Sequence, residues 1–395
     1  MKTLADIASE KKVIVFVGAG GVGKTTCAAA MAIIGAMIGK KTLVFTIDPA
    51  RRLANSLGLP YLGNEPVRID PELFENAGIK CKGELYGMMV DTKRSFDELI
   101  ERIAPSKETL DQILQNRYYQ NLSSALAGSQ EYIATEKMYE IHSSGRFDLI
   151  VLDTPPTRHA LDFLDAPRRV TEFLDGRVVQ WFVKPYLFAG KLGFKFAIPS
   201  ATIIFRILEK FTGYEVLADL TEFFLHFENM YDGFKIRAQF VKEMLGNRNI
   251  TSFVLVTTPS QSALEEASFF RDRLISFGMP LGGFCINRIM PNPWPVDRNE
   301  LSKRIHEVAR MPRHLSSKRI KEIENISQNL LDLVSLAEAE ESAIREFAAV
   351  ADQNMPLAKI PLFTNDVHDL SGLAQLAGYF REEGKNNHGD RKSFS

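Results

Sequence analysis

The chain has 395 residues, of which 45% are hydrophobic and 25% charged, and these values exclude wholesale disorder. A chain of this length forms one large α/β domain or two ordinary ones. Its 48 lysine and arginine residues balance 49 aspartate and glutamate residues, so the net charge of −1 favours neither nucleic acid nor an anionic membrane as a partner.

The predicted elements alternate between short β-branched runs and helical patterns, which indicates a doubly wound, mostly parallel α/β sheet. Most strand candidates are continuous apolar runs, typical of strands covered on both faces. The predicted strands are residues 13–17, 42–47, 149–152, 253–256, 283–286 and 358–360. The predicted helices are residues 24–38, 95–103, 129–143, 262–277 and 320–349.

Residues 161–245 break this alternation with a helical pattern that holds 13 of the 27 phenylalanines, between Phe163 and Phe240. One interpretation is a helical insertion that packs its own core; the other is a subdomain that shows an apolar surface to a partner. We expect residues 1–160 and 246–385 to form one domain, residues 161–245 a helical aromatic-rich insertion, and residues 386–395 a polar tail.

No stretch of the sequence is long enough to span a membrane. The first residues, MKTLADIASEKK, lack the apolar core of a signal peptide. The longest uncharged apolar stretch, residues 25–39, has about fifteen residues, short of the roughly 18 that a span needs. Three distant cysteines, Cys27, Cys81 and Cys285, without any CxxC pair, are typical of a reducing compartment. We therefore expect a soluble, cytoplasmic protein, with visits to the membrane surface left open.

Residues 18–25 form a complete G-x-x-x-x-G-K-[ST] pattern between a predicted strand and a predicted helix. Glycines let backbone N–H groups turn inward and cradle phosphate oxygens at the positive end of the helix. Lys24 would add a charge on the same oxygens, and the Thr25 hydroxyl would bind Mg²⁺. The predicted nucleotide-binding residues of this P-loop are Gly18, Ala19, Gly20, Gly21, Val22, Gly23, Lys24, Thr25 and Thr26.

Two aspartates follow predicted strands at the edge where such sheets bind ligands. Asp153 is predicted to hold Mg²⁺ together with Thr25, directly or through the metal's water shell. Asp48 is predicted, with Lys24, to be catalytic, because phosphoryl transfer requires a positioned or deprotonated water. For either aspartate, a plain helix N-cap remains the alternative.

The stretches GAGGVGKTT, DPARRLANSLG and DTPPTRHALDFL together resemble the ArsA-like ATPases, which include arsenite-pump ATPases and the guided-entry ATPase that delivers tail-anchored membrane proteins. Later stretches, among them GFCINR and KIPLFTNDVHDLSGL, fit in the same order. The resemblance implies a P-loop NTPase fold and a Mg²⁺-dependent ATP hydrolase. It also implies a dimer with ATP near the subunit interface, adenine recognition by Asn287, and Pro361 with Leu362 beside the base. Asn287 could as well cap a turn.

The P-loop departs from that family at Ala19, where the family's signature lysine reaches the partner's phosphates. Three explanations stay open: slow hydrolysis, a substituting cation, or a heterodimer with a lysine-bearing paralogue in place of a homodimer. Arg51, Arg52 and Arg158 lie in the two switch motifs and are candidate replacements. They could equally be solvated surface charges.

The cysteines also bear on function, because the guided-entry ATPases share zinc through a CxxC pair that this sequence lacks. We expect no zinc and no thiol-bound metalloid. The residues between Lys303 and Lys321 hold seven basic side chains and one acid, which favours a solvated helical hairpin over a basic patch for a membrane or nucleic acid. We expect no nucleic-acid partner.

Several functions remain open for an ATP-driven dimer of this kind. A hydrophobic protein client, as in targeting or chaperone work, is favoured by the phenylalanine-rich insertion. The energising subunit of an anion export system and a nucleotide-gated scaffold with little hydrolysis are the alternatives. A positioning ATPase of the ParA/MinD type is more distant, because the insertion is long and the tail is too polar to bind a membrane as an amphipathic helix.

Overall fold

The computed structural model describes residues 2–48, 50, 52–104, 106–116, 119–120, 129–155, 231–293, 298–310, 317–350 and 355–382. The described strands are β1 (Val13–Val17), β2 (Lys41–Thr46), β3 (Val67–Arg68), β4 (Glu84–Met89), β5 (Leu149–Asp153), β6 (Thr251–Thr257), β7 (Leu281–Ile289) and β8 (Leu357–Pro361). They form one eight-stranded sheet in the order β3-β4-β2-β5-β1-β6-β7-β8. Neighbours are parallel except that β3 is antiparallel to β4, which confirms the predicted α/β fold.

All six predicted strands are present, each within a few residues of its expected bounds. The sequence did not predict β3 and β4. Strand β4, with the sequence ELYGMM, contains no β-branched residue and a central Gly87, so its local pattern is weak. It forms because β2 pairs with it along six residues and because Leu57 and Leu62 pack close against Gly87.

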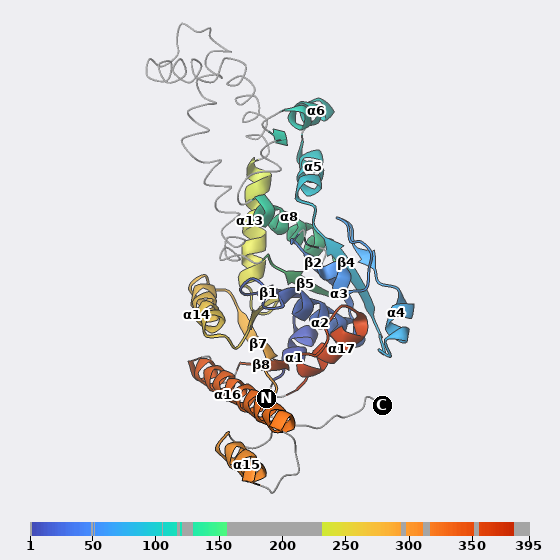
Figure 1. Cartoon of the computed structure of the whole chain (residues 1–395). Helices are drawn as coiled ribbons and strands as arrows, with labels where there is room; N and C mark the ends of the chain where they lie inside the picture. Colours follow the sequence, from blue (N-terminus) through green and yellow to red (C-terminus); the bar gives the residue numbers. More distant parts are fainter. Residues whose placement is uncertain are drawn as a thin grey trace, which may run out of the picture.

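The described helices are α1 (Leu4–Glu10), α2 (Lys24–Met37), α3 (Arg52–Ser56), α4 (Pro71–Asn76), α5 (Thr92–Ile103), α6 (Lys107–Gln115), α8 (Ser129–Ser143), α13 (Tyr231–Gly246), α14 (Gln261–Ser276), α15 (Arg298–Arg310), α16 (Ser317–Val350) and α17 (Leu370–Tyr379). They cover both faces of the sheet (Figure 1). All five predicted helices are among them. The short helices α1, α3, α4 and α6 and the C-terminal α17 were not predicted.

Alternating strand residues divide the core into two layers, as the two-residue period of a strand requires. On one face Val15, Phe45 and Leu152 pack with α5, α8, α13, α14 and α16. On the other face Ile14 and Val44 pack with α1, α2, α3 and α17. Helix α2 lies at the centre of that second layer, and eleven of its fourteen residues are buried. The glycine-rich loop that precedes α2 is therefore attached to a helix that is buried along most of its length.

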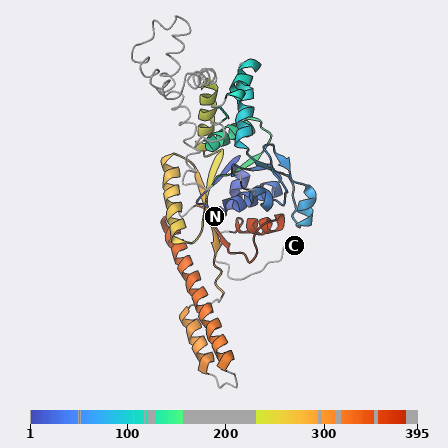
Figure 2. The ribbon, with the colours of Figure 1, turned by 45° about the horizontal axis from the view of Figure 1, so that its top comes forward.

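Helices α15 and α16 contact each other and extend together away from the sheet as a hairpin (Figure 2). The hairpin agrees with the helical arrangement predicted for the basic stretch, and residues 311–316 of that stretch lie outside the described residues. Within the described part of the chain, no helix combines the length and the apolar character that a membrane crossing requires.

Most of the predicted insertion, residues 161–230, lies outside the described residues. Its described end is α13, whose Val241, Met244 and Leu245 are buried in the core layer that α8 and the sheet form. The expected boundary at residue 245 thus falls in a helix whose last turns pack on the sheet. The helical pattern of the insertion continues without a break to residue 245, so the sequence offers no mark of where packing on the sheet begins.

Candidate functional site

The phosphate loop connects β1 to α2 through a backbone that requires glycine. Gly18, Gly21 and Gly23 have φ values of 148°, 79° and 97°, a region that residues with a Cβ rarely adopt. A Cβ on Gly18 would collide with the carbonyl oxygen of Val256, and one on Gly23 with the side-chain amide of Asn287. The loop therefore packs tightly against residues of β6 and β7, and it leads directly into the N-terminus of α2.

Lys24 is buried, with 5% of its surface exposed, and its Nζ bonds back to the loop itself. The amine donates to the carbonyl oxygens of Gly18 at 3.0 Å and Ala19 at 2.7 Å. Burial lowers the pKa of Lys24, while the carboxylates of Asp153 and Asp48 act in the opposite direction. An anion placed in the loop would offer this amine charged acceptors in place of two carbonyl groups.

Asp153 ends β5 and is 1% exposed. Its Oδ2 accepts hydrogen bonds from the hydroxyls of Thr25 at 2.7 Å and Thr46 at 2.9 Å. Its Oδ1 is buried and has no hydrogen-bond partner among the described residues. Burial raises the pKa of Asp153 to about 6, against the hydrogen bonds from the two threonines and the charge of Lys24. A cation beside Thr25 would compensate this buried carboxylate, so the donor set fits Mg²⁺.

Asp48 follows β2 and lies in the same cluster. Its Oδ1 accepts a hydrogen bond from the backbone N–H of Ala50 at 2.9 Å, and its own N–H donates to the Thr46 hydroxyl at 3.1 Å. The carboxylate therefore bonds to the segment before α3, and this bond is not to the helix itself, so the N-cap alternative stays a prediction. Asp48 also lies on the wall of a cavity, so the two roles do not exclude each other.

Thr46 is a site residue that sequence reasoning missed. Its buried hydroxyl donates to Asp153 and accepts from the N–H of Asp48, so it joins the ends of β2 and β5. The only local signal was a hydroxyl two residues before an aspartate at a strand end. A threonine inside a β-branched strand is too common for that signal to stand out.

A cavity of about 430 Å³ opens above these residues at the carboxyl edge of the sheet. Nine of the predicted site residues line it: Gly21, Gly23, Lys24, Thr25, Thr26, Asp48, Asn287, Pro361 and Leu362. Asp153 lies beneath Thr25 and does not line the cavity; Gly18, Ala19, Gly20 and Val22 likewise do not. Lining residues that the sequence did not single out include Asn55, Ser56, Thr154, Arg288, Phe363 and Asp366.

Asn287, near the end of β7, has partners for its side-chain amide inside the protein. Its Nδ2 donates to the carbonyl oxygen of Val22 at 2.9 Å, and its Oδ1 accepts from the N–H of Arg288 at 2.9 Å. In this arrangement the residue braces the phosphate loop from below. Contact with a base stays a prediction for Asn287, as it does for Pro361 and for the half-exposed Leu362.

The cations proposed to replace the family's lysine are only partly within the described residues. Arg51 and Arg158 lie outside them. Arg52 begins α3, is exposed and lines the cavity. Ala19 is half-buried, and its methyl group packs against the core layer that contains α2. It therefore offers no charge at the position of the family's lysine.

The sequence model of the anion-transporting ATPases matches residues 11–353. The chain belongs to this family. The match confirms the resemblance drawn from the three motif stretches, and it covers the phosphate loop, both aspartates and the α15–α16 hairpin.

Individual members of the family show the same likeness. The chain is 27% identical to "Putative arsenical pump-driving ATPase 1" of Aquifex aeolicus over 71% of its own length and 64% of the relative's. It is 27% identical to "ATPase GET3" of Chaetomium globosum, over 71% and 74% of the two chains. It is 26% identical to "ATPase ARSA1" of Chlamydomonas reinhardtii, over 71% and 35%. The chain thus spans less than two thirds of two of these relatives.

Two of the three cysteines of this family member meet in the fold, although they lie far apart in the sequence. The sulfur atoms of Cys27 and Cys285 lie 3.5 Å apart, both fully buried, where α2 packs on β7. Cys81 is half-buried elsewhere and donates to the carbonyl oxygens of Gly83 and Ala36. Within the ranges that the structure describes, no group of three or more His, Cys, Asp or Glu side chains is arranged to hold a metal ion. Mg²⁺ needs fewer protein ligands, because phosphates and water complete its shell.

Proposed function

We propose that this chain is a Mg²⁺-dependent ATP hydrolase whose substrate binds in the cavity at the carboxyl edge of the sheet. The assembly of the glycine loop, Lys24 and Thr25 around one cavity, with Asp48 on its wall and Asp153 bonded to Thr25 beneath it, carries the proposal. Phosphate binding at such a loop uses backbone N–H groups at a helix N-terminus together with one lysine. Family membership supports the same chemistry.

Each residue has a distinct task in this proposal. The loop amides bind phosphate oxygens, and Lys24 exchanges the carbonyl oxygens of Gly18 and Ala19 for the β- and γ-phosphate oxygens. Thr25 and Asp153 would hold Mg²⁺, Asp153 through water, and the metal would neutralise charge on the phosphates. Asp48 accepts a hydrogen bond from the attacking water and places it in line with the γ-phosphate.

The test is steady-state and single-turnover hydrolysis of ATP with Mg²⁺, for the wild type and for Asp48→Asn. Loss of a positioned base costs about 10²–10⁴-fold in turnover, while ATP binding should change little. Asp111→Asn, at an exposed aspartate of α6, is the matched control and should hydrolyse ATP like the wild type. Equal turnover in Asp48→Asn would exclude Asp48 from the reaction, and a wild type that binds no ATP would exclude the function itself.

We further propose that the chain acts as an ATP-driven dimer that handles a hydrophobic protein client. The support is the concentration of phenylalanine between Phe163 and Phe240 and the likeness to ATPase GET3. Both a homodimer and a heterodimer with a lysine-bearing paralogue accord with Ala19. Light scattering with ATP and Mg²⁺ should give a dimer mass, and a dye-labelled single-span peptide should bind in a nucleotide-dependent way. A peptide that binds in no nucleotide state would contradict the client role.

The second candidate is the energising subunit of an anion export system. The description of the family and the printed name of the Aquifex relative favour it. The two neighbouring thiols, Cys27 and Cys285, are fully buried, and the described residues hold no group of three or more metal-ligating side chains, which counts against arsenite as the activator. ATP hydrolysis measured with and without arsenite separates the two, because stimulation by arsenite would favour the export role. A scaffold with little hydrolysis is the third candidate, suggested by Ala19, and a wild type that binds ATP without turnover would identify it.

A further inference from the structure

The strand order gives the cavity two distinct ends. Strand β2, which Asp48 follows, and strand β5, which ends at Asp153, lie on one side of β1, and strands β6, β7 and β8 lie on the other. The phosphate loop follows β1 and therefore lies between the two ends. If ATP binds as proposed above, with its γ-phosphate near Asp48, its base must point toward the ends of β7 and β8. The inference below rests on that proposed function.

Arg288 stands at this second end in an unusual backbone conformation. Its φ of 61° makes it the one non-glycine residue with a positive φ among the described residues. The pairing of β7 with β8 shifts register between Ile286 and Ile289, so the residue lies in a bulge. A left-handed conformation is unfavourable for a residue with a Cβ, and such strain is found where ligands are held.

The neighbouring contacts fix this bulge. The N–H of Arg288 donates to Asn287 Oδ1, while the other end of the same amide holds the carbonyl oxygen of Val22 in the phosphate loop. Beyond the bulge, the N–H of Leu362 donates to the carbonyl oxygen of Ile289 at 2.8 Å. The bulge thus connects the phosphate loop to the residue that follows β8, and it directs Arg288 to the cavity wall.

The side chain of Arg288 is exposed and makes no hydrogen bond or ion pair with any residue that the structure describes. Three other exposed arginines, Arg94, Arg102 and Arg304, each contact a glutamate. A strained backbone that presents an unpartnered guanidinium to a cavity gains nothing within the chain itself. A ligand in the cavity would supply the missing partner.

We propose that Arg288 is a nucleotide-binding residue that contacts the base of ATP, with its planar guanidinium stacked on the ring. A guanidinium stacks well on aromatic faces because it is flat, charged and weakly hydrated. The exposed Leu362 lies at the same end of the cavity and offers the base an apolar neighbour.

Binding of ATP, ADP and inorganic tripolyphosphate to Arg288→Ala, measured by calorimetry, tests the proposal. ATP and ADP should each lose about fivefold to thirtyfold in affinity, the range for a lost cation–π contact. Tripolyphosphate, which has no base, should bind within about twofold of the wild type. Arg288→Lys keeps the charge without the flat group, so its ATP affinity should lie between those of the wild type and Arg288→Ala. Arg304→Ala, on the α15–α16 hairpin, is the control and should bind all three ligands normally.

Arg288→Gly separates the backbone from the side chain. Glycine accepts the left-handed conformation, so the ligand-free variant should melt at or above the temperature of Arg288→Ala while binding ATP just as weakly. If Arg288 merely shaped the bulge, glycine would restore ATP binding. Restored binding in this variant would therefore overturn the proposal.

Further outcomes separate this proposal from the proposed function. ATP affinity within about twofold of wild type in Arg288→Ala would overturn it, as would an equal loss for tripolyphosphate and ATP, which marks a phosphate contact. The proposed function would survive either result, provided that Lys24→Met weakens both ligands. A wild type that binds neither ATP nor tripolyphosphate would overturn both.

Discussion

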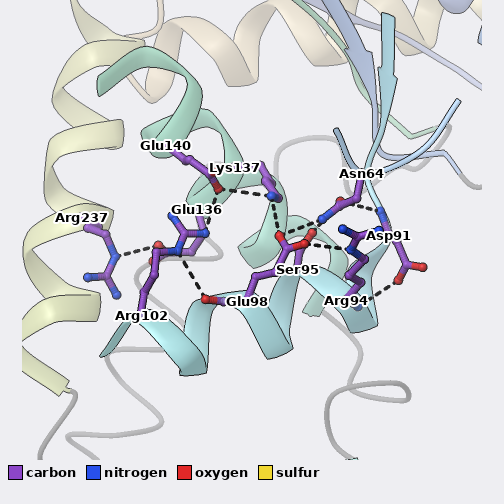
Figure 3. A network of polar contacts seen from close by, with 10 residues as sticks. All are labelled: Asn64, Asp91, Arg94, Ser95, Glu98, Arg102, Glu136, Lys137, Glu140 and Arg237. Carbon is purple, nitrogen blue, oxygen red and sulfur yellow. Dashed lines mark hydrogen bonds and ion pairs between the residues drawn. The ribbon is translucent and has the colours of Figure 1, made fainter. Parts of the chain in front are cut away.

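The cavity at the carboxyl edge of the sheet and the polar network on α5, α8 and α13 each bury a lysine, and the two lysines have different partners. Lys137, 3% exposed, lies 2.8 Å from Glu98 and 3.2 Å from Glu140 (Figure 3). Lys24, 5% exposed, bonds to two carbonyl oxygens. No carboxylate of the described residues lies within ion-pair distance of it. One buried charge is neutralised inside the chain, and the other is not.

The carboxylates of the two regions differ in the same way as the lysines. In the network, Glu98 accepts hydrogen bonds from Lys137, Asn64 and Arg94, and it ties α8 to α5 and to the loop before β3. In the cavity, Asp153 keeps one buried oxygen without a partner among the described residues. Burial of a charge alone therefore does not identify a binding site in this molecule. The missing counter-charge does, because an uncompensated buried charge is costly unless a ligand completes it.

Lys24→Met should produce the largest change on the cavity side. We expect ATP affinity to fall by about a hundredfold or more, since the side chain supplies the fixed positive charge at the phosphates. The free energy of unfolding without ligand should change by no more than about 1 kcal/mol, because the loss of two hydrogen bonds to carbonyl oxygens is offset by the removal of a buried charge that has no counter-charge. Calorimetry and urea unfolding provide the two measurements. A variant that binds ATP normally would contradict the role of Lys24.

Lys137→Met is the matched substitution in the network and should show the reverse pattern. Removing this lysine leaves Glu98 and Glu140 without their shared cation, which should destabilise the fold by about 2–3 kcal/mol. We expect less than for a fully buried pair because both carboxylates are partly exposed to solvent. ATP affinity at low denaturant should stay within about twofold of the wild type. A strong loss of ATP affinity without loss of stability would mean that the network serves the nucleotide.

Thr46→Val removes the hydroxyl that joins Asp48 to Asp153. The turnover number should fall by about tenfold, since both aspartates lose a hydrogen bond that positions them, while ATP affinity stays within about threefold. Thr46→Ser keeps the hydroxyl and should retain most of the activity. If serine and valine lower turnover equally, the residue acts through packing and the bridging role is wrong.

Asp153→Asn tests the uncompensated carboxylate through pH. The pKa of Asp153 is raised from 3.8 to about 6 in the folded chain, so between these two values the folded state binds more protons than the unfolded state, and stability falls as the pH rises. The wild type without Mg²⁺ should lose about 1.4 kcal/mol of stability relative to Asp153→Asn between about pH 5 and pH 7.5. Urea unfolding of both proteins in chelator measures the difference. A difference that does not change with pH would show that Asp153 is already compensated in the fold.

The sequence predicted the half of the site that is local in the chain. The glycine loop, Lys24 and Thr25 are contiguous in the sequence. Asp48 and Asp153 each follow an apolar run that predicts a buried strand. The same periodicity predicted the six long strands and five of the helices. Strand β4 escaped because its strand character comes from pairing with β2, and Thr46 escaped because its two partners belong to the turn after β2 and to β5.

The polar network and Arg288 could not be predicted for a related reason. Glu98, Lys137 and Arg237 come from three helices that are distant in sequence and in contact in the fold. Arg288 follows a recognisable strand, yet its direction depends on a bulge and a left-handed backbone that leave no mark on an arginine in sequence. Local patterns specify which elements form; contacts between distant elements decide which charges lack a partner.

The most direct test is calorimetric titration of the wild type and of Lys24→Met with ATP, each in Mg²⁺ and in chelator. The account predicts that the wild type binds ATP more tightly with Mg²⁺ than without it, because the metal compensates Asp153. It also predicts that Lys24→Met loses affinity in both conditions. Absence of ATP binding by the wild type, or equal binding by the two proteins, would contradict the claim that this cavity holds Mg²⁺ and ATP.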